Sequence, residues 1–258
     1  MKTFIVIPNY IVSEELKELA IQTIKSFRES SKDIVIISVD DGSPMDCTFL
    51  KEISDIYIKN KENSGFAISC NNGFKRAFRT AKNDDFIVCA NNDIEVYPGW
   101  QETMQGLFTE FSNVAITGIC HSRERESLGE HLRDKHDTKV VEGGQASVMQ
   151  DGGLWMSTKG VLKKVGLFDE QFIRGGYEDV DLFLRMRDTY GMKILMTERA
   201  WYWHKEGATR WNCEKNDYIN NFGLESKGIE VENLERFMAK WNFNPHINSP
   251  WHSNELVS

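Results

Sequence analysis

Two short apolar runs in this chain end abruptly in polar residues, which limits the folds that it can adopt. Residues 86–89 lead into Asn91-Asn92-Asp93, and residues 34–39 lead into Asp40-Asp41. Short apolar runs of this kind are typical of strands that are buried in a sheet. In open α/β sheets, ligands bind in the crevice beyond the carboxyl ends of the strands. Since a hard divalent cation takes oxygen ligands, the two strand ends predict a site for a nucleotide and a metal at one sheet edge.

The order of the expected elements supports this fold class. Strands are expected at residues 4–7, 34–39, 55–59 and 85–89, and helices are expected between them, after Ser13 and at 48–53 and 65–82. Strands that alternate with helices predict a parallel sheet covered on both faces. The later expected elements are a helix at 100–111, strands at 114–120 and 149–157, helices at 159–165 and 178–188, a strand at 194–196 and a helix at about 231–241. Residues 121–144 fit either a hairpin that reaches toward an acceptor or a solvated connection.

Composition narrows the class of protein. The 258 residues carry a formal charge of -8, which disfavours general binding to nucleic acid. Long apolar runs are missing, so we expect no transmembrane helix. The five cysteines are scattered and form no CxxC pair, which indicates neither zinc nor a disulfide framework and fits a cytoplasmic protein.

A series of short motifs resembles those of the family-2 glycosyltransferases, which have the GT-A fold. The motifs are Ile5-Val6-Ile7-Pro8-Asn9-Tyr10, Val39-Asp40-Asp41-Gly42-Ser43, Asn63-Ser64-Gly65-Phe66-Ala67, Asn71-Asn72-Gly73, Asn91-Asn92-Asp93 and Gly176-Tyr177-Glu178-Asp179-Val180-Asp181-Leu182. They occur in the family's order and spacing, from about residue 3 to residue 210. The resemblance implies a Rossmann-like, mostly parallel GT-A domain at residues 1–210, followed by a small helical and aromatic extension at 211–258.

The resemblance also implies an activity, the transfer of a sugar from a nucleotide-diphosphate sugar to an acceptor hydroxyl with inversion at the anomeric carbon. A divalent cation, Mn²⁺ or Mg²⁺, bridges the two phosphates of the donor in such enzymes. Asp93 matches the last acid of the family's metal-binding motif. His204 matches a late histidine that completes the metal shell, and a neutral imidazole suits Mn²⁺. The alternatives are that Asp93 caps a turn and that His204 has a structural role.

Further positions are expected to contact the donor. Asp41 is expected beside the nucleotide base, and Asp40 is expected to orient this loop or to touch the ribose, although a polar turn explains the same residues. Asn63, Gly65 and Asn71 surround the start of a helix, where free N–H groups can meet phosphate and where asparagine also serves as a cap. The full set of expected donor contacts is Pro8, Tyr10, Asp40, Asp41, Asn63, Gly65, Asn71, Asn92, Gly153 and Arg210.

The adjacent acids Glu178 and Asp179 are the candidate catalytic pair. Inverting transfer needs a carboxylate to take the proton of the attacking hydroxyl. The resemblance points to Asp179 as this base, with Glu178 next to it, whereas Asp181 is expected to pair with Arg185. Trp155 is expected either to stack on the acceptor sugar or to pack in the core.

Two other functions stay open at this stage. A nucleotidyltransferase shares a doubly wound sheet and an acidic metal site, but it normally has a glycine-rich, basic phosphate loop where this chain has residues 8–12. A non-catalytic carbohydrate-binding protein on the same fold would be expected to lose Asp93 or Asp179, and neither is lost. UDP is the expected nucleotide and a saccharide the expected acceptor, while the sugar, the acceptor and the oligomeric state are not specified by the sequence.

Overall fold

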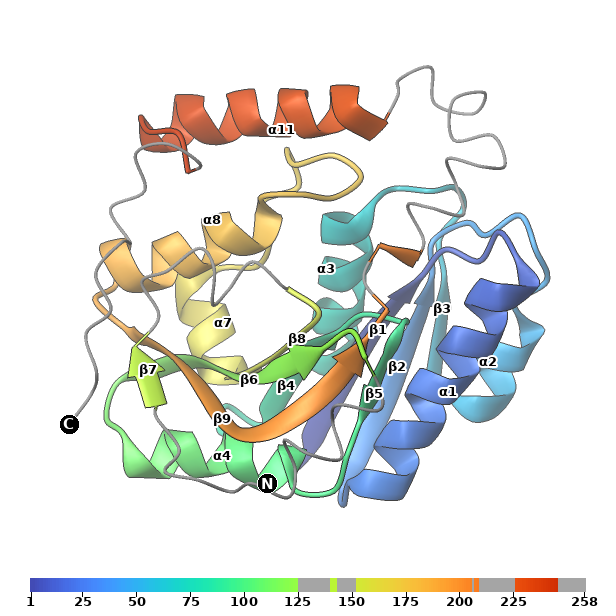
Figure 1. Cartoon of the computed structure of the whole chain (residues 1–258), viewed down its shortest axis with the longest axis horizontal. Helices are drawn as coiled ribbons and strands as arrows, with labels where there is room; N and C mark the ends of the chain where they lie inside the picture. Colours follow the sequence, from blue (N-terminus) through green and yellow to red (C-terminus); the bar gives the residue numbers. More distant parts are fainter. Residues whose placement is uncertain (125–139, 143–151, 206, 209–225, 246–258) are drawn as a thin grey trace.

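The structure is a computed structural model that describes residues 1–124, 140–142, 152–205, 207–208 and 226–245. Its described strands form one sheet in the order β3-β2-β1-β4-β8-β6-β9-β5, with β7 paired to β9 (Figure 1). The strands are β1 (Thr3–Asn9), β2 (Ile34–Asp40), β3 (Ile56–Lys59), β4 (Phe86–Ala90), β5 (Ile94–Val96), β6 (Val114–Ser122), β7 (Val140–Glu142), β8 (Leu154–Thr158) and β9 (Lys193–His204). The helices are α1 (Glu14–Ser30), α2 (Thr48–Ile53), α3 (Phe66–Ala77), α4 (Trp100–Glu110), α7 (Lys159–Val165), α8 (Glu178–Leu184), the π-helical turn η1 (Arg185–Thr189) and α11 (Ser226–Trp241).

The first half of the sheet is parallel, as the sequence predicts. Strand β1 pairs in parallel with both β2 and β4, and β2 pairs in parallel with β3. The carboxyl ends of these strands therefore meet at one edge, where Asn9 lies opposite Asp40. Helix α1 starts after Ser13, whose hydroxyl accepts a hydrogen bond from the Leu16 amide at 3.2 Å. The predicted cap is thus confirmed.

Alternation along the strands builds two hydrophobic layers. In β1, Ile5 and Ile7 face a cluster with residues of α1 and α4, whereas Phe4 and Val6 face a cluster with residues of α3, α7 and α8. Successive side chains of a strand point to opposite faces, so each apolar strand fills both layers. The expected helices on both faces of the sheet are confirmed.

The second half of the sheet departs from the expected parallel pairing. Strand β8 inserts antiparallel beside β4, with Ala90 opposite Leu154. The short strand β5 was not expected, and β9 is longer than the predicted 194–196 because it continues to His204 and pairs there with Ile94. These two pairings bring residues 152–153 and His204 to the end of β4, where the polar triplet 91–93 begins.

Helix α11 lies across α8 in Figure 1. Phe237 of α11 is fully buried in a cluster with Phe172 and Leu184. Residues 209–225 lie outside the described part of the chain, so the predicted domain boundary near residue 210 stays a prediction. Among the described residues, no helix is long and apolar enough to cross a membrane.

Candidate active site

Three side chains converge where β4 ends. Asp93 Oδ1 lies 3.2 Å from His204 Nε2, and Asn91 Nδ2 lies 3.3 Å from the same nitrogen. Asp93 and His204 are 4% and 2% exposed. The pairing of β5 with β9 produces this corner, because Ile94 and His204 lie opposite each other in the register. The structure thus brings together the two residues that the sequence predicts as metal ligands.

The donor set in this corner suits a hard divalent cation. It contains a carboxylate oxygen, an imidazole nitrogen and Asn91 Oδ1, an enclosed oxygen with no hydrogen-bond partner in the described part of the chain. Mn²⁺ and Mg²⁺ accept such ligands and commonly complete their shells with substrate phosphates. Within the described ranges no group of three or more His, Cys, Asp and Glu side chains is arranged to hold a metal. The corner therefore offers Asp93 and His204 as two candidate protein ligands, with Asn91 Oδ1 on a side chain that contacts His204.

Asp41 organises the neighbouring loop. Its Oδ1 accepts hydrogen bonds from the Ser64 amide (2.9 Å), the Ser64 hydroxyl (2.6 Å) and Asn60 Nδ2 (2.8 Å), and its Oδ2 accepts one from the Gly65 amide (2.8 Å). Asn63 Oδ1 is a second, longer acceptor for Gly65 at 3.2 Å. A carboxylate has about four acceptor positions. Asp41 therefore holds residues 60–65 in place, and its contact with a nucleotide base stays a prediction.

Asp40 is fully buried and supports the same edge of the sheet through two hydrogen bonds. Its Oδ1 accepts from the Ser43 amide and its Oδ2 from the Tyr57 hydroxyl, at 2.9 and 2.8 Å. Burial, followed by this hydrogen bond to Asp40, raises the pKa of Tyr57 well above its ordinary value, so the phenol stays a donor. Pro8 is buried in β1, and Tyr10 lies half-buried just beyond it. Of Pro8, Tyr10 and Asp40, Tyr10 alone is not fully buried.

The acids of α8 approach the same edge through two close contacts. A Cβ added at Gly65 would lie 2.6 Å from the Arg174 amide nitrogen, so the loop after β3 touches the segment that leads into α8. A Cβ added at Gly152 would lie 2.4 Å from Asp179 Oδ2. The carbonyl of Gly153 accepts a hydrogen bond from the Asn91 amide at 2.8 Å. Asp179 is thus linked to the 91–93 corner through the two glycines that precede β8.

The buried thiol of Cys70 reports the same convergence. Burial raises its pKa well above the ordinary value, and a hydrogen bond with Cys89 and the charges of Glu178 and Asp41 add to the shift. The charges of Glu178 and Asp41 therefore both act on the Cys70 thiol in α3. Glu178 is 5% exposed, whereas Asp179 is half-buried.

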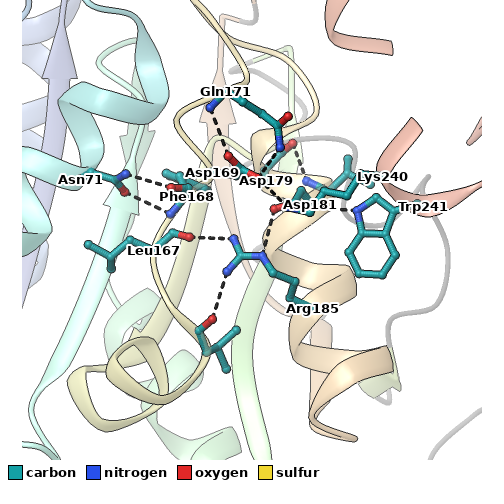
Figure 2. Close-up of polar contacts among 12 residues, drawn as sticks. Asn71, Leu167, Phe168, Asp169, Gln171, Asp179, Asp181, Arg185, Lys240 and Trp241 are labelled. Atoms are coloured by element: carbon teal, nitrogen blue, oxygen red, sulfur yellow. Dashed lines mark hydrogen bonds and ion pairs between the residues drawn. The ribbon is translucent and has the colours of Figure 1, made fainter. Parts of the chain in front are cut away.

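Two expected contacts receive a different role. Asn71 Nδ2 donates to the Phe168 carbonyl at 2.9 Å, and Asn71 Oδ1 accepts from the Phe168 amide at 3.1 Å (Figure 2). Asn71 Nδ2 also donates to Glu170 at 2.9 Å, so both of its N–H groups are used. Trp155 is 1% exposed and packs against Phe74, Phe168 and Phe183. The donor contact of Asn71 and the acceptor contact of Trp155 are therefore corrected. Asn71 ties α3 to residues 168–170, and Trp155 is a core residue.

The remaining expectations concern Asn92, Arg210 and the pair of Asp181 and Arg185. Asn92 is 5% exposed, and its Nδ2 has no hydrogen-bond partner in the described part of the chain. Arg210 lies outside the described residues, so its donor contact stays a prediction. The expected pair of Asp181 and Arg185 is confirmed, with Nε and Oδ2 2.9 Å apart.

Sequence reasoning assigned no function to two residues of this region. Asn60 links Asp41, Ser64 and Ser69 through its Nδ2 and accepts from Asn72. Asn233 on α11 reaches the loop before α8. Neither residue lies in a local pattern that would have revealed it, because the partners lie up to 60 residues away in the chain.

Comparisons with known proteins agree with this geometry. The sequence model of the family described as Glycosyl transferase family 2 matches residues 4–166, more than half of the chain. A search of curated proteins found no match. Among solved structures, a crystal structure of GalNAc-T7 with UDP, GalNAc and Mn²⁺ has a TM-score of 0.61 at 11% identity and covers 79% of this chain. This chain spans 43% of the GalNAc-T7 chain.

The crystal structure of S. aureus TarS 1-349 has a TM-score of 0.58 at 14% identity. The match covers 94% of this chain and 73% of the TarS chain. At these identities the likeness shows the fold, which is the predicted GT-A arrangement. Together with the match over residues 4–166, these findings show that the chain belongs to glycosyl transferase family 2.

Proposed function

We propose that the chain transfers a sugar from a nucleotide-diphosphate sugar to an acceptor hydroxyl on a saccharide, with inversion and with UDP as the nucleotide. The observation that carries the proposal is the corner formed by Asp93, His204 and Asn91 at the end of β4. Asp179 lies against Gly152, and the carbonyl of the next residue, Gly153, accepts a hydrogen bond from the Asn91 amide. Membership of the family supports the reaction class.

The corner suits the leaving diphosphate. A bound Mn²⁺ or Mg²⁺ would act as a Lewis acid that stabilises the charge on this leaving group. Asp93 and His204 would hold the ion, with Asn91 Oδ1 as a further oxygen ligand. The presence of UDP and Mn²⁺ in the GalNAc-T7 structure, which shares the fold, supports this assignment.

The acids of α8 suit proton transfer from the acceptor. Asp179 is half-buried and touches the 152–153 turn, so it can meet both solvent and the donor side of the site. A carboxylate within hydrogen-bond reach of the attacking hydroxyl takes its proton as the bond to the anomeric carbon forms. We assign this role to Asp179 and the orientation of the acceptor to the more deeply buried Glu178.

The donor's nucleoside is proposed to lie over the loops that Asp40 and Asp41 hold. Tyr10, Asn63, Gly65, Asn92 and Gly153 remain the proposed contacts, because they lie along this edge or in the 91–93 corner. Asp40 and Pro8 are buried and support this edge of the sheet. Asp41 positions the Ser64 and Gly65 amides, which is a contribution of its own beyond any contact with the base.

The test is release of UDP from UDP-glucose, UDP-galactose and UDP-N-acetylglucosamine, with Mn²⁺ and with EDTA. We expect slow, Mn²⁺-dependent release, with water as the acceptor, that falls by at least about 100-fold but stays measurable in Asp93→Asn and in Asp179→Asn. Formation of a UDP-sugar and pyrophosphate from UTP and a sugar 1-phosphate would instead indicate a nucleotidyltransferase. A thermal shift with donor but no turnover in any condition would indicate a non-catalytic carbohydrate-binding protein.

A further inference from the structure

The segment that leads into α8 has an unusual backbone. Four consecutive residues have positive φ: Arg174 (62°), Gly175 (137°), Gly176 (105°) and Tyr177 (71°). Two of them, Arg174 and Tyr177, carry side chains that disfavour this region. Such conformations persist only where the surrounding structure holds them, and they gather near functional groups. Here the next two residues in the chain are Glu178 and Asp179.

The side chain of Asn233 in α11 forms hydrogen bonds with this segment. Asn233 Nδ2 donates to the carbonyls of Ile173 at 2.9 Å and Gly175 at 3.1 Å. Arg236 donates to Asn233 Oδ1 at 2.9 Å, which fixes which end of the amide faces the loop. Asn233 is fully buried. An amide offers two N–H groups, and here both are spent on the carbonyls that flank Arg174.

The same helix also holds the first turn of α8. Asp181 is fully buried, and its Oδ1 accepts from Lys240 Nζ at 2.7 Å and from Trp241 Nε1 at 2.9 Å, while Arg185 occupies Oδ2 (Figure 2). Lys240 also reaches Asp169, at 2.6 Å. The ring of Phe237 packs against Tyr177 with 5.6 Å between centroids. Contacts from α11 therefore reach α8 on both sides of Glu178 and Asp179.

We propose that α11 is the element that sets the position of the acids of α8, and that Asn233 is its principal positioning residue. The inference rests on the proposed function, in which Asp179 is the base. Asn233 acts through the 173–177 loop, since its side chain forms hydrogen bonds with two carbonyls of this loop and with Arg236. Helix α11 lies beyond residues 4–166, the part of the chain that matches the family. Residues outside the matched region thus complete the catalytic edge.

The experiment compares Asn233→Ala with Leu107→Ala in the full chain. Leu107 is fully buried in a separate cluster with Val114 and Leu195, so its truncation lowers stability without touching α8 or α11. We measure kcat and donor KM for Mn²⁺-dependent UDP release from the UDP-sugar that the wild-type protein turns over best. Both variants are also made in an Asp179→Asn background. Hydrogen exchange of the amides of residues 173–181 is followed in parallel.

We expect Asn233→Ala to lower kcat by about 10- to 100-fold, because displacement of a reacting group by about 1 Å has this effect. The donor KM should change by less than about twofold, since the Asn233 side chain holds the loop before α8 and not the 91–93 corner, and the amides of 173–181 should exchange faster. In the Asp179→Asn background the same substitution should cost less than about twofold more, because residues that act as a unit are not additive. Leu107→Ala should lower the melting temperature and leave kcat within about twofold.

Three results would overturn the inference. An unchanged kcat in Asn233→Ala, or an equal loss in both backgrounds, would show that Asn233 does not act through Asp179, while the proposed function would stand. Unchanged exchange at 173–181 would show that Asn233 does not hold the loop. Failure of the wild-type protein to release UDP from any of the three sugars would instead refute the proposed function, and the positioning role with it.

Discussion

Replacement of Gly152 by alanine tests the proposed geometry at its tightest point. The added Cβ would lie 2.4 Å from Asp179 Oδ2, whereas ordinary contact begins at 3.4 Å. Either the carboxylate or the 152–153 turn must therefore move by about 1 Å, and a displacement of that size costs on the order of 100-fold in rate. This corresponds to about 2.7 kcal/mol in the barrier.

The fold should tolerate this change. Gly152 has no positive φ, so alanine adopts its backbone without strain. The nearest atoms belong to the end of one short, half-buried side chain rather than to packed backbone. We expect the free energy of unfolding to change by less than about 1 kcal/mol, in line with an exposed or partly exposed substitution.

The assay is the kcat of Mn²⁺-dependent UDP release, measured together with a urea unfolding curve. Gly106→Ala is the matched control, since a Cβ added at Gly106 in α4 meets nothing within 4 Å. This control should keep full activity and gain about 0.4–1 kcal/mol in stability from its less flexible unfolded chain. A Gly152→Ala protein with wild-type kcat would refute the placement of Asp179 as the base.

Three further predictions concern Asp93, Asp41 and Asp169. Asp93→Asn should lower Mn²⁺-dependent UDP release by at least about 100-fold without changing the melting temperature in EDTA, because it removes a ligand charge from the metal corner; equal activity of the two proteins would contradict the assignment. Asp41→Asn should lower the free energy of unfolding by about 1–3 kcal/mol, because one amide group cannot accept all four hydrogen bonds, and a urea curve that matches wild type would contradict it. Burial works to raise the pKa of Asp169, but hydrogen bonds from Lys240 and Gln171 outweigh it and hold the pKa below 3.8. A depressed pKa stabilises the fold above pH 3.8 and loses that effect as the pH falls through the folded value, so the stability difference between wild type and Lys240→Met should shrink below about pH 4 in urea titrations; a constant difference would contradict the sign.

The sequence was sufficient for the parts of the fold that follow from local patterns. Strands β1, β2 and β4 carry apolar residues on both faces, and their polar ends identify the functional edge without reference to any other part of the chain. The bounds of α2 and α7 matched the prediction, and in α7 the Thr158 side chain caps the start while Gly166 ends the helix. The Asp93–His204 contact was expected from the resemblance, and β5 supplies the physical reason for it.

Long-range packing was beyond the reach of these patterns. In the sequence, a buried asparagine within a helix looks the same whether its amide faces a ligand or a neighbouring segment, so the role of Asn71 was misassigned. The side of the sheet that Trp155 faces depends on the antiparallel insertion of β8, which no local pattern predicts. The contact of Asn233 with residue 173 spans 60 positions and depends on how α11 packs.

The central claim is that the corner at Asp93 binds a cation together with the diphosphate of the donor. Calorimetric titration of UDP into the wild-type chain and into Asp93→Asn, each with Mn²⁺ and with EDTA, tests it most directly. We predict that UDP binds the wild-type chain only with Mn²⁺ and that Asp93→Asn weakens this binding by at least about tenfold, which is about 1.4 kcal/mol. UDP binding of equal strength in EDTA, or in the variant, would contradict the account.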